Sequence, residues 1–386
     1  MLILGIESSC DDTSVALVNC SESGHVVIAE KTASQIDIHK KYGGVVPEIA
    51  GRMHAEKIVP LIEAVLAGQP KPDAIAVTAG PGLVTGLIVG VEAAKTLSFA
   101  WNIPLVAVNH LSGHIHSVEL SPQTTIQFPA LALIVSGGHT ELVRLKSHTD
   151  LKILGSTKDD AAGECFDKVA KLLGLPYPGG PQISKLASEG RINAIDFPRP
   201  MLHEDNFNFS FAGLKTSALY WMRDNSLVIP TEVASGDRAE VSRSLLGESL
   251  GVGKRDSSTP PPIGGSAQND SAHVTTNDFC ASFEQAIVEV LVAKTLRAAE
   301  EIKPTTLILG GGVAANKKLR TTLSEAVAAM LPNTKMLIPS LPYCMDNGAM
   351  IAVAGFYQAL QKKFSSWENL SVNPVWHVDE PNILIR

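Results

Sequence analysis

Two short apolar strands, each followed by a turn of small polar residues, constrain the fold of this chain most. The first strand is expected at residues 2–7, before Ser8–Thr13, and the second at residues 131–135, before Ser136-Gly137-Gly138. In each half a returning strand comes next, and helices and strands then alternate. This alternation is typical of α/β proteins. The halves echo each other without an alignable repeat, so we expect two lobes that face a nucleotide-binding cleft.

The spacing of apolar residues predicts the other elements. Strands are expected at residues 14–18, 26–30, 74–78, 105–108, 140–145, 151–155 and 305–309. Helices are expected at residues 45–66, 85–99, 161–173, 182–189, 279–300, 316–330 and 347–360. The uncharged run 74–91 contains Gly80-Pro81-Gly82, so it is interpreted as strand, turn and helix and not as a membrane span.

Composition narrows the class of protein. The net charge of -7 does not by itself indicate nucleic-acid binding. The five cysteines lack a C-x-x-C pair and indicate free thiols in a reducing compartment. No leader precedes the first strand, so we expect a cytoplasmic protein. Residues 226–277, rich in Ser, Gly, Pro and Asp, are expected to form a flexible insertion with a short helix at 239–246.

The run His110-Leu-Ser-Gly-His114 is the sharpest local motif. On a helix, residues four apart share a face, so both imidazoles can reach one metal ion. A pair of buried histidines without metal explains the spacing equally well. Leu111 occupies the position where zinc proteases carry a glutamate base, which argues against a protease. Asp346 is the best candidate for a third ligand, but it could instead cap the helix that follows.

Glycine-rich turns and acidic residues suggest where a nucleotide would bind. The turns Ser136–His139 and Gly310–Asn316 follow predicted strands, and a third turn lies at residues 178–181. Backbone N–H groups of such turns can approach phosphate closely. Asp11 and Asp12 lie in the first turn. Asp167 could bind a ribose hydroxyl or could face solvent.

Several longer motifs in order extend this evidence. They are Leu4-Gly-Ile-Glu-Ser-Ser-Cys-Asp11, Tyr42-Gly-Gly-Val-Val-Pro-Glu48, Ala79-Gly-Pro-Gly-Leu83, His110–His114, Val135–Thr140, Asp159–Lys168, Tyr177-Pro-Gly-Gly180, Phe209-Ser-Phe-Ala-Gly-Leu-Lys-Thr216, Gly310–Asn316 and Asp346-Asn-Gly-Ala-Met350. The chain resembles the tRNA adenosine threonylcarbamoyltransferase family, formerly called O-sialoglycoprotein endopeptidases. The resemblance covers nearly everything outside the insertion.

The resemblance implies a two-lobed actin-like ATPase fold, built from duplicated RNase H-like units. We expect one lobe at residues 1–108 and the other at 109–386. It also implies that the threonylcarbamoyl group of threonylcarbamoyl-AMP passes to the N6 amine of the adenosine beside the anticodon. The tRNAs concerned are those that read codons beginning with A. AMP is released.

The resemblance also assigns roles to residues. It makes His110, His114 and Asp346 the ligands of one divalent metal ion, iron(II) or zinc. It places the adenylate donor against Ile134, Val135, Ser136, Gly137, Gly138, Asp167, Gly180 and Asn316. Asp11, with Asp12 beside it, is the candidate base or orienting group for the amine, although a metal-site or turn role is equally consistent.

Two departures from the family pattern are informative. Ile134 stands where archaeal and eukaryotic cytosolic relatives carry tyrosine, which places the chain on the bacterial and mitochondrial branch. Asp12 stands where many bacterial members have glutamate. Bacterial relatives act with a smaller paralogous subunit and a P-loop ATPase, whereas mitochondrial relatives act as homodimers. An actin-like kinase or ATPase, a metalloprotease and a scaffold that only binds nucleotide are the alternatives, and no membrane partner is expected.

Overall fold

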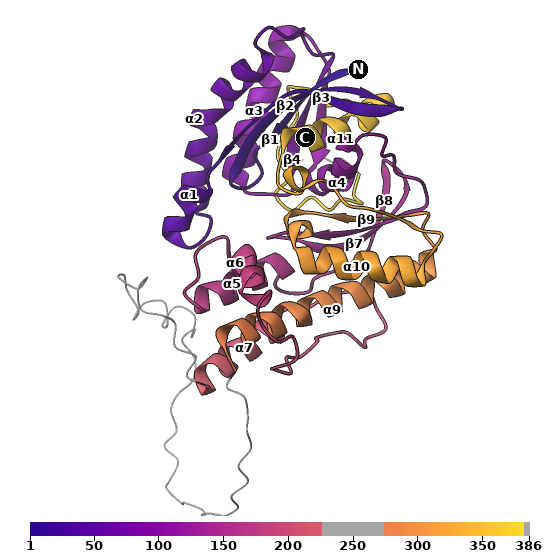
Figure 1. Cartoon of the computed structure of the whole chain (residues 1–386). Helices are drawn as coiled ribbons and strands as arrows, with labels where there is room; N and C mark the ends of the chain where they lie inside the picture. Colours follow the sequence, from indigo (N-terminus) through magenta and orange to yellow (C-terminus); the bar gives the residue numbers. More distant parts are fainter. Residues whose placement is uncertain (226–273, 382–386) are drawn as a thin grey trace, which may run out of the picture.

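The computed structural model describes residues 1–225 and 274–381, which form two halves stacked on one another (Figure 1). The expected helix at 239–246 and most of the expected insertion lie outside these residues. The insertion cannot extend to residue 277, because helix α9 begins at Thr276. Thr275 caps that helix and accepts a hydrogen bond from the backbone N–H of Asp278.

Each half contains a five-stranded mixed sheet, and the two sheets have the same topology. The first contains β1 (Leu2–Glu7), β2 (Asp12–Ser21), β3 (Gly24–Ser34), β4 (Ala74–Gly80) and β5 (Leu105–Asn109) in the order β3-β2-β1-β4-β5. The second contains β6 (Ala130–Val135), β7 (Thr140–Ser147), β8 (Asp150–Ser156), β9 (Thr306–Gly310) and β10 (Lys335–Leu337) in the order β8-β7-β6-β9-β10. In both, the first three strands are antiparallel neighbours and the last two run parallel to the first. The predicted α/β architecture is therefore confirmed.

Helices cover both faces of each sheet. They are α1 (Ile36–His39), α2 (Pro47–Leu66), α3 (Val84–Trp101), α4 (His110–His116), α5 (Ala162–Leu172), α6 (Gly179–Ala187), α7 (Ala212–Asp224), α9 (Thr276–Ile302), α10 (Lys317–Met330) and α11 (Gly348–Leu360). Short 3-10 turns occur at η1 (Lys40–Tyr42), η2 (Ser117–Leu120), η4 (Gly312–Ala315) and η5 (Leu341–Tyr343). In Figure 1, α2 and α3 flank the first sheet, and α9 and α10 lie on the side of the second sheet away from it.

The alternation of side chains along each strand divides the interior into separate cores. On β1, Leu4 and Ile6 pack with α2 and α3, whereas Ile3 packs with α11 on the opposite face. On β6, Leu133 belongs to the core formed with α5 and α9, whereas Ala132 packs with α4. Both strands are buried on both faces, which explains their continuous apolar sequences.

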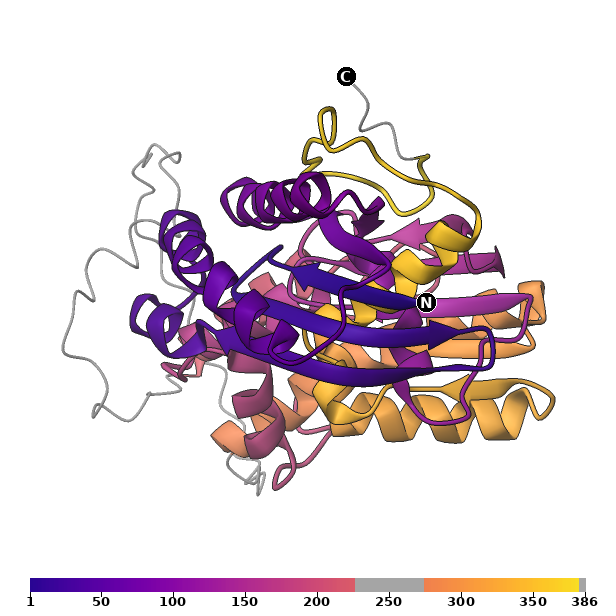
Figure 2. The same cartoon turned by 90° about the horizontal axis from the view of Figure 1, so that it is seen from above.

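Two helices each follow a strand of one sheet but pack against the other sheet. Helix α4 follows β5 of the first sheet but packs its Leu111 and Ile115 against the second sheet. Helix α11 follows the last strand of the second sheet but packs against β1, β2 and β4 of the first. The two helices contact each other between the sheets, and Figure 2, seen from above, shows the first half in front of the second. Residues beyond 109 thus contribute to the core of the first sheet.

Some elements that the sequence patterns did not predict begin where a side chain from a distant part of the chain caps them. Helix α7 was not predicted; its first turn is capped by Asp159, whose carboxylate accepts the backbone N–H groups of Phe211 and Ala212. Helix α6 begins at Gly179, ahead of the predicted residue 182, because Asp167 accepts the N–H of Gly179. Strand β10 has three residues, too few to show alternation.

The run 74–91 forms β4, a turn and the start of α3, as expected. Among the described residues, α3 passes a test for membrane spans based on length and composition alone, with a mean hydropathy of 1.2. Helix α3 packs against α2 and β4 in this fold.

A close approach of backbones joins β1 to α11, and Gly5→Ala tests it. A Cβ on Gly5 would lie 2.0 Å from the carbonyl oxygen of Gly348 and 2.7 Å from the backbone nitrogen of Ala352. Because neither backbone atom can move aside freely, we expect a loss of about 3 kcal/mol in unfolding free energy. The matched control is Gly213→Ala in α7, where the nearest atom is a Pro200 side-chain carbon at 3.8 Å. Urea denaturation should show a neutral or stabilising effect for the control. Equal midpoints for both variants would contradict the packing.

Candidate active site

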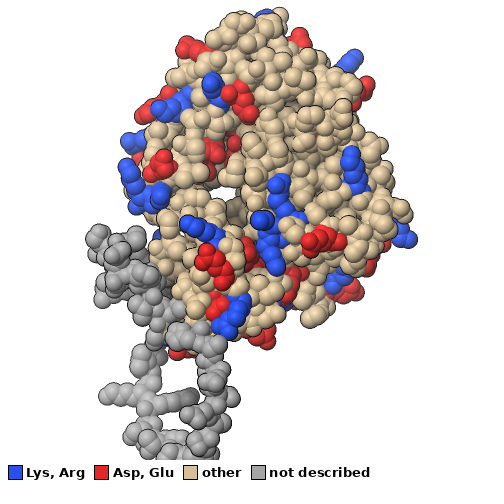
Figure 3. Space-filling view, viewed as in Figure 1, with Lys and Arg blue, Asp and Glu red and all other residues tan. Residues whose placement is uncertain are grey.

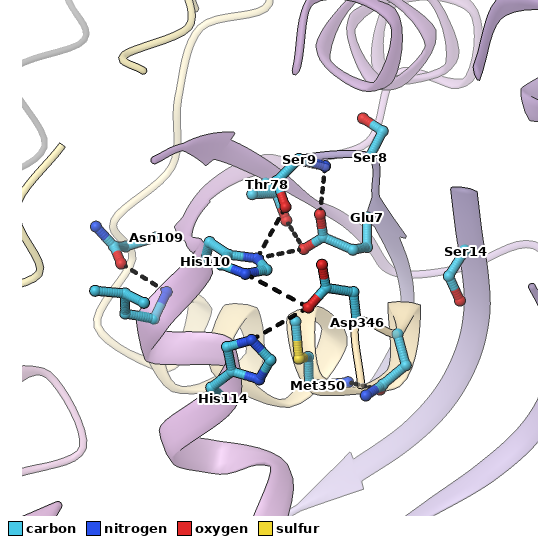
Figure 4. A network of polar contacts seen from close by, with 12 residues as sticks. Glu7, Ser8, Ser9, Ser14, Thr78, Asn109, His110, His114, Asp346 and Met350 are labelled. Atoms are coloured by element: carbon cyan, nitrogen blue, oxygen red, sulfur yellow. Dashed lines mark hydrogen bonds and ion pairs between the residues drawn. The ribbon is translucent and has the colours of Figure 1, made fainter. Parts of the chain in front are cut away.

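The start of α4 and the start of α11 meet between the two sheets. Each helix has an asparagine cap: the Asn109 side chain accepts the N–H of Leu111 at 2.9 Å, and Asn347 accepts that of Met350 at 2.8 Å. The capping alternative for Asp346 is therefore wrong, since Asn347 caps α11. The carboxylate of Asp346 instead points toward the imidazoles of α4 (Figure 4).

His110, His114 and Asp346 come together at this meeting point. Asp346 Oδ1 lies 3.6 Å from His110 Nε2 and 3.2 Å from His114 Nε2. The two imidazole rings stand edge to face, with centroids 4.6 Å apart. All three residues come from positions that the sequence had already selected, and one ligand atom from each lies within 4.8 Å of the others.

Glu7, which sequence reasoning missed, orients this cluster from the end of β1. Its side chain is fully buried and accepts hydrogen bonds from the Ser9 N–H at 2.6 Å and the Thr78 hydroxyl at 2.7 Å. Its Oε2 also lies 3.0 Å from His110 Nδ1, and that contact leaves Nε2 facing Asp346. A charged residue ending an otherwise apolar strand was the available signal.

Charge and burial make the cluster suitable for a cation. Burial alone would lower the pKa of His110, but the charges of Glu7 and Asp346 raise it to about 9. Burial opposes ionisation of Asp346, yet the positive charge of His110 holds its pKa at about 2. His114 is fully buried; its Nδ1 has no hydrogen-bond partner among the described residues, and its Nε2 faces Asp346 Oδ1 at 3.2 Å. Two imidazole nitrogens and one carboxylate oxygen fit a divalent metal ion.

Asp11 lies on the turn between β1 and β2, and Asp12 is the first residue of β2. Burial raises the pKa of Asp11, and the negative charge of Asp346 adds to this shift. Burial raises the pKa of Asp12 to about 7, although a hydrogen bond with Ser34 opposes the shift. One carboxylate oxygen of Asp12 is buried without a partner in the described part of the chain. Both carboxylates are thus held close enough to the cluster to feel its charge.

The turn after β6 combines buried and open residues. Ile134 and Val135 are fully buried core residues, so only their backbone could face a ligand. Ser136 closes the turn: its hydroxyl accepts the His139 N–H at 3.1 Å, and its own N–H donates to the His139 carbonyl at 2.8 Å. Gly137 and Gly138 are exposed, and a Cβ on either would meet no atom within 4 Å.

The remaining donor-site residues have structural partners. Asp167 Oδ1 accepts the backbone N–H groups of Gly179 at 2.7 Å and Gly180 at 3.4 Å. Burial raises the pKa of this carboxyl. Asn316 caps α10 through the N–H of Leu319 and donates from Nδ2 to Glu284 Oε1 at 2.7 Å. The side chains of Asp167 and Asn316 therefore position the loops around them.

Direct contacts link these loops into one wall. The backbone of Gly311, at φ 88°, lies against the carbonyl of Val135, where a Cβ would come within 2.4 Å of that oxygen. Asn316 Nδ2 also donates to Ser184 of α6 at 2.9 Å. His139, another residue that sequence reasoning passed over, has its pKa lowered to about 4 by burial and by the nearby charges of His110 and His114. Figure 3 shows a hollow between the two halves with Lys and Arg side chains near its lower edge.

The buried carboxylate of Asp12 gives a pH-dependent prediction. Because the folded-state pKa is raised from 3.8 to about 7, its contribution to stability is present below pH 3.8 and is lost as the pH rises through 7. Asn cannot ionise, so Asp12→Asn should gain stability over the parent chain on going from pH 4 to pH 8, by on the order of 4 kcal/mol at most. Urea denaturation at both pH values measures this gain. Asp150→Asn, at an exposed site, should show no such gain, and a pH-independent difference for Asp12→Asn would contradict the assignment.

Comparison with known proteins identifies the family. A model of the family described as tRNA N6-adenosine threonylcarbamoyltransferase matches residues 26–353. A protein of that name from Listeria monocytogenes serotype 4b is 44% identical over 377 residues, covering 97% of this chain and 95% of the relative. One from Bacillus subtilis is 45% identical over 359 residues, covering 92% of this chain and 90% of the relative.

A solved structure supports the fold alone. The match to HypF from T. kodakarensis has 14% sequence identity and a TM-score of 0.53. It covers 94% of this chain and 48% of the HypF chain. The two-lobed actin-like architecture expected from the sequence agrees with this likeness. With the family model and relatives that span nearly the whole chain, these findings show that the chain belongs to the tRNA N6-adenosine threonylcarbamoyltransferase family.

Proposed function

We propose that this chain transfers the threonylcarbamoyl group of threonylcarbamoyl-AMP to the N6 amine of the adenosine beside the anticodon in tRNAs that read codons beginning with A. The observation that carries the proposal is the His110–His114–Asp346 cluster, oriented by Glu7 and set in a chain of this family. The alternatives lose ground for specific reasons. Leu111 removes the glutamate base that a zinc protease needs, and the related chains are transferases rather than kinases.

His110, His114 and Asp346 would hold one divalent ion, iron(II) or zinc. Their nitrogen and oxygen donors suit either, and availability decides between such metals as much as geometry does. When bound, the ion would supply positive charge to the donor phosphate. Glu7 orients His110, because the proton shared between Nδ1 and the carboxylate keeps Nε2 facing Asp346, where loss of the second ring proton would free a lone pair for the ion.

The adenylate would lie along the wall formed by the β6–β7 turn and the start of α6. Gly137 and Gly138 present an open backbone, whose N–H groups can donate to the phosphate. Asp167 holds Gly179 and Gly180 in place and keeps Oδ2 for a ribose hydroxyl. Ile134, Val135 and Ser136 shape the turn, and Asn316 fixes the opposite edge through Ser184 and Glu284.

The transfer needs a proton acceptor, because an aromatic amine is a weak nucleophile. The N6–carbonyl bond forms, the bond between that carbonyl carbon and the phosphate oxygen breaks, AMP leaves, and N6 loses one proton. We assign Asp11 or its neighbour Asp12 to orient the amine and take this proton. A carboxylate with a pKa near 7, as burial gives Asp12, suits a general base at neutral pH.

We further propose a cytoplasmic enzyme with helpers. The chain carries Ile134, typical of the bacterial and mitochondrial branch, so the helpers would be a smaller paralogous subunit and a P-loop ATPase; a homodimer is the competing arrangement. The donor would bind between the lobes at residues 1–108 and 109–386, with α11 of the second range packed on the first lobe, while tRNA approaches the hollow of Figure 3.

The central experiment mixes purified chain, threonylcarbamoyl-AMP and unmodified tRNA, with and without the helper subunits. Mass spectrometry follows the modified nucleoside and released AMP. We expect His110→Ala/His114→Ala to abolish transfer and Asp11→Asn to lower it about 100-fold or more. His203→Ala, at an exposed loop position, is the matched control and should be fully active. Release of AMP without modified nucleoside would show that the acceptor is wrong, and activity in the double variant would remove the metal from the reaction.

The substitution Glu7→Gln tests whether Glu7 supports metal binding by positioning His110. The amide keeps the shape of the side chain but removes the charge beside His110, so metal affinity at the His110–His114–Asp346 site should fall about 10- to 100-fold. Competition with a chelator measures this affinity. Binding that persists in His110→Ala/His114→Ala is subtracted, so that only the ion at this site is followed. Glu48→Gln, in an exposed ion pair with Arg52, should bind as the parent chain does. Unchanged affinity in Glu7→Gln would leave Glu7 a merely structural residue.

A further inference from the structure

A second cluster of metal-ligating side chains lies at the other end of α4. It consists of His116 at the end of that helix, Glu119 in η2 and His148 in the turn between β7 and β8. One ligand atom from each lies within 4.8 Å of the others, and His148 Nδ1 is 3.7 Å from Glu119 Oε2. His116 and Glu119 are three residues apart, a spacing that brings side chains to one helical face.

Hydrogen bonds prepare two of these side chains for ligation. His116 Nδ1 donates to the backbone carbonyl of Ser112 at 2.7 Å, which leaves the lone pair of Nε2 directed away from the helix. Glu119 Oε1 accepts the backbone N–H of Ile126 at 3.0 Å, so that the carboxylate is held in place. Such contacts to the atom that does not bind metal are typical of metal ligands.

The atoms left over are buried without partners. His116 Nε2, Glu119 Oε2 and His148 Nδ1 have no close hydrogen-bond partner among the described residues, although the Tyr357 hydroxyl lies near the Glu119 carboxylate and the backbone of His148 lies near His116. His116 is 0% exposed and Glu119 is 1% exposed. A buried carboxylate oxygen beside two imidazole lone pairs is costly unless a cation is shared among them.

We propose that His116, Glu119 and His148 form a second divalent-metal site, separate from the His110–His114–Asp346 cluster, with zinc as its ion. Two imidazole nitrogens and one carboxylate oxygen suit zinc, with water in the fourth position. Ligand atoms about 2.0–2.2 Å from a tetrahedral ion lie roughly 3.3 Å apart, so the present spacing needs a small side-chain adjustment. The His148 side chain is 24% exposed and provides the entry path.

The site would cross-link two segments, the α4–η2 segment and the β7–β8 hairpin, at a place where α11 also contacts them. His116 and Glu119 belong to the α4–η2 segment, and His148 belongs to the β7–β8 hairpin. Tyr357 of α11 stacks on His148, with ring centroids 3.5 Å apart and an angle of 5° between the ring planes. Zinc would therefore tie the helix that carries His110 and His114 to the second sheet. Its role is structural, because none of its ligands belongs to the proposed donor or acceptor sites.

Zinc stoichiometry of the full chain tests the proposal. Metal-free protein is titrated with Zn²⁺ against a chromophoric chelator. We expect two ions per parent chain and one ion in Glu119→Gln/His148→Phe, whose substituted side chains keep the hydrogen bond to Ile126 and the stacking on Tyr357. His110→Ala/His114→Ala should also bind one ion, and the combination of all four substitutions should bind none.

A second readout separates loss of the site from loss of the fold. Zn²⁺ should raise the thermal midpoint of His110→Ala/His114→Ala but not that of the fourfold variant. Glu119→Gln/His148→Phe should keep transfer activity, and if it does not fold, the Glu119→Gln chain decides by the same count. A Glu119→Gln chain that binds as many ions as the parent chain, or a His110→Ala/His114→Ala chain that binds none, would overturn the proposal whatever the outcome for the transferase reaction.

Discussion

The buried charge cluster of Glu7, His110 and Asp346 is the interaction on which the rest of the structure depends. Glu7 ends a strand of the first sheet, His110 begins the helix that crosses to the second, and Asp346 precedes the helix that crosses back. Glu7 and His110 are buried and Asp346 is partly buried, and the opposite charges compensate one another. Removing one partner would leave an uncompensated charge at the contact between the halves. The residues that support binding are therefore also those that fix the position of α4 against α11.

The repeated topology explains why the site lies where it does. Parallel strands of one sheet end at the same edge, so β1, β4 and β5 bring Glu7, Thr78 and Asn109 together. The second sheet does the same with the turns after β6 and β9. Because α4 and α11 exchange sheets, their capped N-termini meet between these two edges. A cluster of cation ligands and a glycine-lined wall for an anion thus adjoin without any long loop.

Much of the fold and part of the site could be predicted from the sequence. The strands, most helices and the α/β class followed from periodicity, because these segments are buried on one or both faces. The pair of His110 and His114 was visible because helical spacing is local. Asp346 could be named as a candidate ligand, but the sequence left open whether it caps α11. Asn347 caps that helix, and sequence spacing does not decide which of two adjacent polar residues becomes the cap.

What sequence reasoning missed depends on contacts between distant segments. The start of α6 depends on Asp167, twelve residues earlier, and that of α7 on Asp159, more than fifty residues earlier. The role of Glu7 appears only when β1 is placed beside α4, 103 residues away in the chain. Ile134 and Val135 were expected to contact the donor, but both side chains are buried in the core of the sheet. Only their backbone atoms could face a ligand.

Anomalous diffraction from crystals of the metal-loaded chain with an adenylate donor analogue would test the central claim most directly. The account predicts a peak bonded to His110 Nε2, His114 Nε2 and an oxygen of Asp346, with the analogue phosphate beside it and against the Gly137–Gly138 turn. Asp346 turned away from the ion, or an adenylate held in a different cavity from the ion, would contradict it.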